Sequence, residues 1–378
     1  MDGEHAAVAA APSPQAGPAH DRRTIELAGL RRVVAAILVI HLIAAIYFAK
    51  DLILPLVLGV LLALTFSPLV RATVRAGAPT ALAAGTFVCL LGGGAVALIF
   101  SLSDRVSELA AEAPRLGFLL RQKLAQLSAS VEAVKDASEE VEKIADAALS
   151  SGEPTVVVAQ PGMLGAAIGN LAGGATTLAV AFILALFILA AGRGVHAKLV
   201  RAFPTFREKR NALETVYEIE IRISRYLFTI TLINAGLGVA IFLAFFAVGM
   251  PYAYLWGLAA FLLNFIPFIG TAIGAATAAA VSIVSFDGIG YALLAPLAYL
   301  ALGSLEGQVV TPSILGRRLE LSAISVLVSL IFWTWAWGVA GALLAVPLLV
   351  LVKAVAERID ALRGLSLLLS SEPAARDP

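Results

Sequence analysis

Charge is scarce in this sequence. Only 14% of its 378 residues are Asp, Glu, Lys or Arg, while 60% are hydrophobic. A soluble domain carries about 25% charged residues. Residues 226–305 contain a single charged side chain, Asp287, and residues 321–352 contain none. Tracts of this kind argue against a water-soluble domain and predict helices that span a lipid bilayer.

Catalytic and metal-binding motifs are also missing. Cys89 is the only cysteine, so an internal disulfide is impossible. No lysine follows a glycine, which excludes the GK[ST] phosphate-binding loop and hence an ATP motor within the chain. The four histidines show no metal-binding spacing, no GxSxG motif is present, and a net charge of +1 offers no basic surface for nucleic acid. The sequence therefore predicts a protein that is not an enzyme and that uses no metal or cofactor.

The apolar stretches predict an all-α polytopic membrane protein. A helix needs about 20 apolar residues to cross the hydrocarbon core of a bilayer. Eight stretches are expected to do so: 33–49, 52–70, 80–102, 163–191, 226–248, 289–304, 321–337 and 339–352.

The tract after Met250 is best divided by a re-entrant hairpin near residues 255–286. The piece from Trp256 to Ile266 has too few residues to cross about 30 Å at a rise of about 1.5 Å each. Asn264, Pro267 and Gly270 cluster where the backbone would turn back. Non-helical backbone at this depth is tolerated only inside protein or beside a watery cavity. A single full crossing by residues 255–286 remains the alternative.

Loop charges predict the orientation. Residues 103–161 hold six Lys or Arg and ten Asp or Glu, whereas residues 192–225 hold eight and four. Because basic loops stay in the cytoplasm, we expect 103–161 outside, 192–225 inside and both termini inside. The predicted segments are a disordered cytoplasmic tail (1–32), three spans (33–102), an extracytoplasmic helical segment (103–161), a span with a cytoplasmic helix (162–225), the remaining spans with the hairpin (226–355) and a cytoplasmic tail (356–378).

Several smaller patterns indicate packing. Apolar or small residues recur with a 4-3 spacing from Leu120 to Ala148, which predicts an amphipathic helix that packs on its own subunit or on a neighbouring one. Small-xxx-small ridges predict close helix packing and are formed by Gly165, Gly169 and Gly173, and by Gly270 and Gly274. His41 is either a functional ionisable group or a neutral side chain hydrogen-bonded between helices. Trp333, Trp335 and Trp337 fit an interfacial belt or a substrate-stacking surface.

Three blocks occur in order along the chain: PYAYLWGLAAFLLNFIPFIGTAIG at 251–274, LEGQVVTPSILGRRL at 305–319 and FWTWAWGVAGALLAVPLL at 332–349. They resemble the signature blocks of the autoinducer-2 exporter (AI-2E) family of bacterial permeases, over about residues 33–355. The resemblance implies a transporter in the bacterial cytoplasmic (inner) membrane and a homo-oligomer such as a pentamer. Arg225 to Thr229 depart from the family pattern, which carries a Gly-Gln pair nearby, so the resemblance leaves the solute open.

Polar and helix-breaking residues within these blocks are the candidate site. The proposed solute path contains Asn264, Pro267, Phe268, Gly270 and Thr271. Its Asn264 amide can both donate and accept, and backbone groups near Ile266 and Pro267 are expected to be freed by the break. The proposed cytoplasmic mouth contains Glu306, Gln308, Thr311, Pro312 and Arg317, where a Glu306–Arg317 pair could act as a gate. The alternatives are that Asn264 and Pro267 only cap and kink a helix, and that Glu306 and Arg317 form a plain ion pair.

Three functions compete. The first is a secondary permease that exports a small polar solute such as autoinducer-2. The second is a sodium/proton antiporter, which would be expected to use carboxylates at membrane depth, whereas Asp51, Asp287 and Glu306 all lie at the ends of spans. The third is a membrane scaffold that transports nothing. Partners are expected to be the lipid bilayer, the solute and other copies of the chain.

Overall fold

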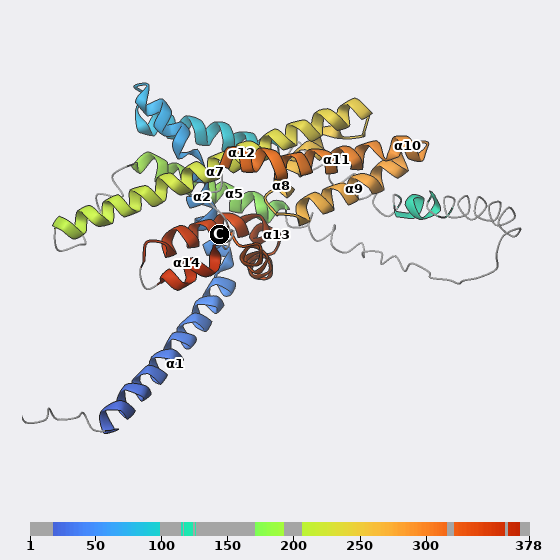
Figure 1. Cartoon of the computed structure of the whole chain (residues 1–378). Helices are drawn as coiled ribbons and strands as arrows, with labels where there is room; N and C mark the ends of the chain where they lie inside the picture. Colours follow the sequence, from blue (N-terminus) through green and yellow to red (C-terminus); the bar gives the residue numbers. More distant parts are fainter. Residues whose placement is uncertain are drawn as a thin grey trace, which may run out of the picture. The chain divides into compact units, whose positions relative to one another are not determined.

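The computed structural model describes residues 18–98, 115, 117–123, 125, 171–192, 206–315, 321–359 and 362–370. In these ranges the regular structure is helical, apart from one isolated antiparallel bridge between Leu321 and Ser370 (Figure 1). The predicted all-α class is thus confirmed for the described residues. The chain divides into two compact units, residues 1–50 and residues 51–378.

The first unit consists of helix α1 (Pro18–Phe48). The helix begins at Pro18, where the missing N–H costs nothing in the first turn, rather than at the expected Val33. Residues 18–32, predicted to belong to a disordered tail, are therefore helical. The apolar part, Val33–Phe48, is shorter than a full span. The Nδ1 of His41 donates to the carbonyl of Ile37 one turn earlier in the same helix, at 2.8 Å.

In the second unit, α2 (Lys50–Arg75), the helical residues Thr80–Leu98 and α5 (Leu171–Ala191) share one hydrophobic cluster. Small buried side chains such as Ala63, Ala84 and Ala185 bring these helices close together. At Gly59 a side chain would lie 2.9 Å from the Ala181 carbonyl oxygen, so only glycine fits there without a shift. These contacts are typical of membrane helices, which approach through small residues.

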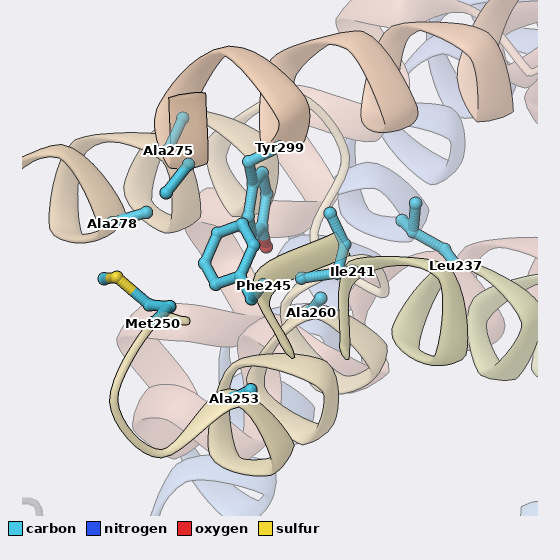
Figure 2. Close-up of a cluster of buried hydrophobic side chains, with 10 residues drawn as sticks. Leu237, Ile241, Phe245, Met250, Ala253, Ala260, Ala275, Ala278 and Tyr299 are labelled. Carbon is cyan, nitrogen blue, oxygen red and sulfur yellow. The ribbon is translucent and has the colours of Figure 1, made fainter. Parts of the chain in front are cut away.

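A second cluster joins α7 (Phe206–Val248), α8 (Ala253–Leu263), α9 (Ile269–Ser285) and α11 (Leu294–Leu305). Figure 2 shows the rings of Phe245 and Tyr299 side by side at its centre, with a centroid separation of 6.3 Å. Helix α7 packs most extensively on α8. Gly238 and Gly257 make this possible, since a Cβ on either would lie 2.7 Å from the other's carbonyl oxygen. The predicted boundary between a cytoplasmic helix and a span at 225/226 falls inside the continuous helix α7.

Helix α10 (Ile289–Ala292) precedes α11, which continues into the π-helical turn η1 (Glu306–Val310) and α12 (Thr311–Leu315). Helix α13 (Ala323–Ala356) reverses direction at Gly338, whose φ is 64° and ψ is −142°. The reversal brings Ser329 beside Ala345, whose carbonyl accepts from the Ser329 hydroxyl at 2.9 Å. In a straight helix these sixteen residues would span about 24 Å. The arms 323–337 and 339–356 therefore form a hairpin, divided where the sequence predicted. Helix α14 (Arg363–Leu369) packs on α13.

Six described helices are long and apolar enough to cross a membrane: Lys50–Arg75, Thr80–Leu98, Gly174–Ala191, Val216–Val248, Ile289–Leu315 and Ala323–Ala356. The sequence predicted eight. Two differences account for the number: the two arms of α13 count as one helix here, and the apolar part of α1 is short. The sequence and the structure both indicate a multi-pass membrane protein.

Candidate functional site

The candidate path lies at a helix–turn–helix between α8 and α9. Helix α8 has eleven residues, about 16 Å, and α9 begins at Ile269 after the turn 264–268. Gly270 closes the turn, because a Cβ there would collide with the carbonyl group of Leu263. Phe268 takes a positive φ of 61° and is 81% exposed. The break expected near Asn264, Pro267 and Gly270 is thus present.

The turn satisfies more of its own backbone than expected. The Ile266 N–H donates to the Leu263 carbonyl at 2.9 Å, and the Ile266 carbonyl accepts from the Gly270 N–H at 2.9 Å. The Pro267 carbonyl accepts from the Ile269 N–H at 2.6 Å. The expectation of free backbone groups at Ile266 and Pro267 is therefore wrong, because the chain closes tight local bonds there. Asn264 supplies the one side-chain amide of the turn.

The Asn264 amide meets a second amide that the sequence did not single out. Asn264 Nδ2 donates to Asn234 Oδ1 of α7 at 2.9 Å. Asn234 is completely buried, and its Nδ2 has no hydrogen-bond partner among the described residues. The two residues are thirty positions apart, so no local spacing links them. The sequence does show one asparagine in each of two consecutive apolar segments, Asn234 and Asn264, and this could have suggested the pair.

The turn also contacts the α13 hairpin. Ile266 is buried in a cluster with Leu330 on the first arm of α13 and with Ala342 and Ala345 on the second arm. Trp333 packs against the same cluster. Trp337 is buried and its ring lies 4.5 Å from that of Trp333, while Trp335 is 58% exposed. The three tryptophans therefore do not form a single exposed belt: two of them belong to the interior beside the turn.

Part of the proposed mouth is assembled around η1. The Glu306 carboxylate accepts a hydrogen bond from the Thr311 hydroxyl, and the Thr311 N–H donates to the Glu306 carbonyl. An i→i+5 bond defines a π-turn, a feature often found at functional sites. Gln308 and Pro312 are exposed beside this pair. Arg317 lies outside the described residues, so the proposed Glu306–Arg317 gate does too.

The path and the mouth are neighbours. A Cβ on Gly303 of α11 would lie 2.8 Å from Cγ2 of Thr271, at the start of α9. Glu306 follows Gly303 by three residues, about 4.5 Å along the helix. Gly274, one turn after Gly270, packs so closely on Tyr299 that no Cβ would fit. The packing role predicted for the Gly270–Gly274 ridge agrees with these contacts, whereas the side chains around Gly165, Gly169 and Gly173 lie outside the described residues.

Polar contacts between distant segments form two groups. In the first, Lys123 Nζ donates to the Phe286 carbonyl at 2.9 Å and lies 3.8 Å from the Asp287 carboxylate, while the Tyr291 hydroxyl donates to the Val248 carbonyl at 2.8 Å. Lys123 and Asp287 belong to segments predicted to lie outside, and Val248, Phe286 and Tyr291 lie at or near the ends of segments predicted to face the outside.

The second group joins segments predicted to lie inside. Arg71 of α2 contacts Glu220 of α7 at 3.1 Å. Glu218 of α7 pairs with Arg358 after α13. The other inside contacts are Arg222 with Glu357 at 2.6 Å and the Ser322 N–H with the Leu369 carbonyl at 3.0 Å.

No group of three or more His, Cys, Asp or Glu side chains in the described part of the chain could hold a metal ion. Most of the predicted heptad helix, from Leu120 to Ala148, also falls outside that part.

Comparison with known proteins identifies the family. The model of the AI-2E family transporters matches residues 36–361. The AI-2 transport protein TqsA of Escherichia coli K12 is 28% identical over 346 residues, which cover 92% of this chain and 97% of TqsA. The E. coli K12 protein named "Putative transport protein YhhT" is 26% identical over 338 residues, covering 89% and 93% of the two chains. A Haemophilus influenzae protein named "Putative transport protein" is 25% identical over 332 residues, covering 86% and 91% of the two chains. The resemblance in the sequence blocks is thereby confirmed, and the chain belongs to the AI-2E family of membrane transport proteins.

Proposed function

We propose that the protein is a secondary permease of the bacterial cytoplasmic membrane that exports a small, uncharged polar solute similar to autoinducer-2. TqsA, which is similar along almost its whole length, is named for autoinducer-2 transport. The observation that carries the proposal is the broken α8–α9 hairpin, which brings the Asn264 amide to the fully buried Asn234 within an otherwise apolar layer. Broken helices at membrane depth are the usual place for a transported solute.

The depth of the turn supports a re-entrant hairpin. Asn234 precedes the end of α7 by fourteen residues (234 to 248), about 21 Å. Helix α8 runs back along α7, as the Gly238–Gly257 contact requires. The hydrogen bond between Asn264 and Asn234 therefore holds the turn short of the opposite side of a core about 30 Å thick.

The two groups of polar contacts support the proposed orientation. Lys123 belongs to the segment expected outside, and its bond to the Phe286 carbonyl supports the same side for residues 286–287. A single crossing by residues 255–286 would put Asp287 inside and separate this pair. The second group joins the basic segment 192–225 to Arg71 and to the end of α13, all expected in the cytoplasm.

Glu306, Gln308, Thr311, Pro312 and Arg317 form the proposed cytoplasmic mouth. Glu306 lies seventeen residues after Ile289 (289 to 306), about 26 Å along the helix. This puts it near the inner surface if Ile289 lies at the outer one. On the proposed topology its carboxylate lies near the inner surface, which fits a permease for uncharged solutes better than a cation antiporter.

Substitution of Asn264 tests the function. We expect Asn264→Ala to reduce solute flux per folded molecule about tenfold, because a hydrogen bond of about 1–2 kcal/mol is lost. The measurement is flux of labelled glycerol, ribose and autoinducer-2 into proteoliposomes, normalised to folded protein. Thr277→Ala is the matched control, since the Thr277 hydroxyl bonds only within α9, to the Ile273 and Gly274 carbonyls. Full flux per folded Asn264→Ala molecule would remove this residue from the path, and absence of flux in the unmodified protein would refute the permease.

A further inference from the structure

Asn234 combines complete burial with an unused donor. Its Oδ1 accepts from Asn264 Nδ2, whereas its own Nδ2, which carries two N–H bonds, has no partner among the described residues. Most buried side-chain polar atoms have at least one hydrogen-bond partner, so a buried nitrogen with none calls for an explanation. A leucine would occupy a similar volume without that donor, and packing alone therefore does not account for the amide.

The surroundings define what such a donor can bind. Residues 226–286 contain no Asp, Glu, Lys or Arg, so no charge is available along α8, α9 or the membrane part of α7 to balance a charged ligand. The neighbours Ile233 and Leu237 are apolar and buried. The turn backbone at Ile266 and Pro267 is already bonded internally and does not compete for the Asn234 donor. A neutral molecule with an oxygen acceptor is the matching ligand class.

We propose that Asn234 is a solute-binding residue that donates through Nδ2 to a carbonyl or hydroxyl oxygen of a neutral solute. The inference rests on the proposed permease function and adds a second binding residue and an oxygen acceptor on the solute. Asn264 has a positioning role. By donating to Oδ1 of Asn234 it fixes the orientation of that amide and leaves Nδ2 for the solute. Because Asn264 belongs to the α8–α9 turn, movement of that turn would release the amide and the solute together.

The test compares two variants with one control on the same helix. Asn234→Leu removes the amide while nearly preserving volume, and Asn234→Ala removes the amide without introducing a charge or a new donor. Thr231→Val is the control, because the Thr231 hydroxyl bonds to the Leu227 carbonyl of its own helix. Each full-length protein is assayed in proteoliposomes with labelled glycerol, ribose, autoinducer-2 and sodium ion. The midpoint of thermal unfolding is recorded with and without each neutral solute.

For the unmodified protein and Thr231→Val we expect flux of at least one neutral solute, together with a rise in unfolding midpoint when that solute is added. Both Asn234 variants should lose flux about tenfold per folded molecule and should lose the solute-induced rise. Asn234→Leu should change the unfolding midpoint without solute only slightly, because it removes one unpaired buried donor but leaves the Asn264 amide without its acceptor.

Three results would overturn the inference. Unchanged flux and unchanged solute-induced stabilisation in a folded Asn234 variant would show that the donor does not bind solute. A lower unfolding midpoint with normal flux per folded molecule would show that the amide is structural, with a buried water as its partner. Transport of sodium but of no neutral solute by the unmodified protein would refute the permease and this inference together. The first two results leave the permease intact, so the two failures are distinguishable.

Discussion

Phe268 has an unusual backbone for a large side chain. Its φ of 61° lies in the region that normally requires glycine, and such a conformation costs about 1–3 kcal/mol. The ring is 81% exposed and so contributes little internal packing. We expect Phe268→Gly to stabilise the folded protein by about 1 kcal/mol, because glycine adopts this φ without strain. A higher midpoint of thermal unfolding in mild detergent would show it.

Phe268→Ala separates strain from the loss of the ring. Alanine removes the aromatic side chain but keeps a Cβ, and therefore keeps the strained conformation. Its unfolding midpoint should stay at or below that of the unmodified protein. Equal stabilisation by alanine and glycine would mean that the ring itself, rather than the backbone, is unfavourable.

Some residues of the candidate site could be predicted from the sequence and others could not. Asn264 was predicted as a path residue because it lies beside Pro267 and Gly270 in one short segment. Asn234 was not, since its partner is thirty positions away and only the packing of α7 on α8 brings the amides together. The backbone bonds of Ile266 and Pro267 were likewise unpredictable, because they depend on how tightly the turn closes.

At the scale of helices, charge counting worked better than hydropathy. The division of residues 321–352 between Trp337 and Val339 followed from keeping Arg317, Arg318 and the C-terminus on one side, and Gly338 is where α13 reverses. The continuity of α7 across residue 225 was missed, because the change from a charged to an apolar surface does not interrupt the helical backbone.

The end of α13 and the charged part of α7 are joined by reciprocal ion pairs. Glu218 pairs with Arg358 and Arg222 with Glu357, so each helix supplies one charge of each sign. We expect Glu218→Arg alone to lower the unfolding midpoint by the equivalent of at most about 1 kcal/mol, since both side chains of its pair are partly exposed. The loss should shrink at high salt.

Reversing the partner provides the control. Glu218→Arg combined with Arg358→Glu restores an attractive pair with the polarity exchanged, and the double variant should recover most of the lost midpoint. A double variant no better than the sum of its two single variants would show that the pair does not couple α7 to the end of α13.

For the whole molecule, the first expectation concerns topology. In a Cys89→Ser background, a cysteine at Ala137 should react with a membrane-impermeant maleimide from outside intact cells. Cysteines at Asn211 and Ser313 should react only after the inner side is exposed, because residues 192–225 and the end of α12 are expected in the cytoplasm. External labelling at Ser313 would reject the re-entrant hairpin while leaving the first five spans in place.

A second expectation concerns assembly. The AI-2E resemblance implies a homo-oligomer such as a pentamer, and the heptad pattern from Leu120 to Ala148 offers one surface for it. Native mass spectrometry in mild detergent should therefore show a discrete multiple of the 39.2 kDa chain. A spectrum containing only the single chain over a range of protein concentrations would argue against assembly.

The contact of Lys123 with the end of α9 has a pharmacological consequence. Its ammonium group binds the carbonyls of Val284, in the last turn of α9, and of Phe286, which directly follows α9. On the proposed topology the contact between Lys123 and the end of α9 faces the external medium. A cyclic peptide or antibody fragment that binds there would restrict movement of the α8–α9 hairpin. Such an inhibitor would not need to cross the membrane or to resemble the solute. A single substitution at the proposed solute path would not confer resistance to it.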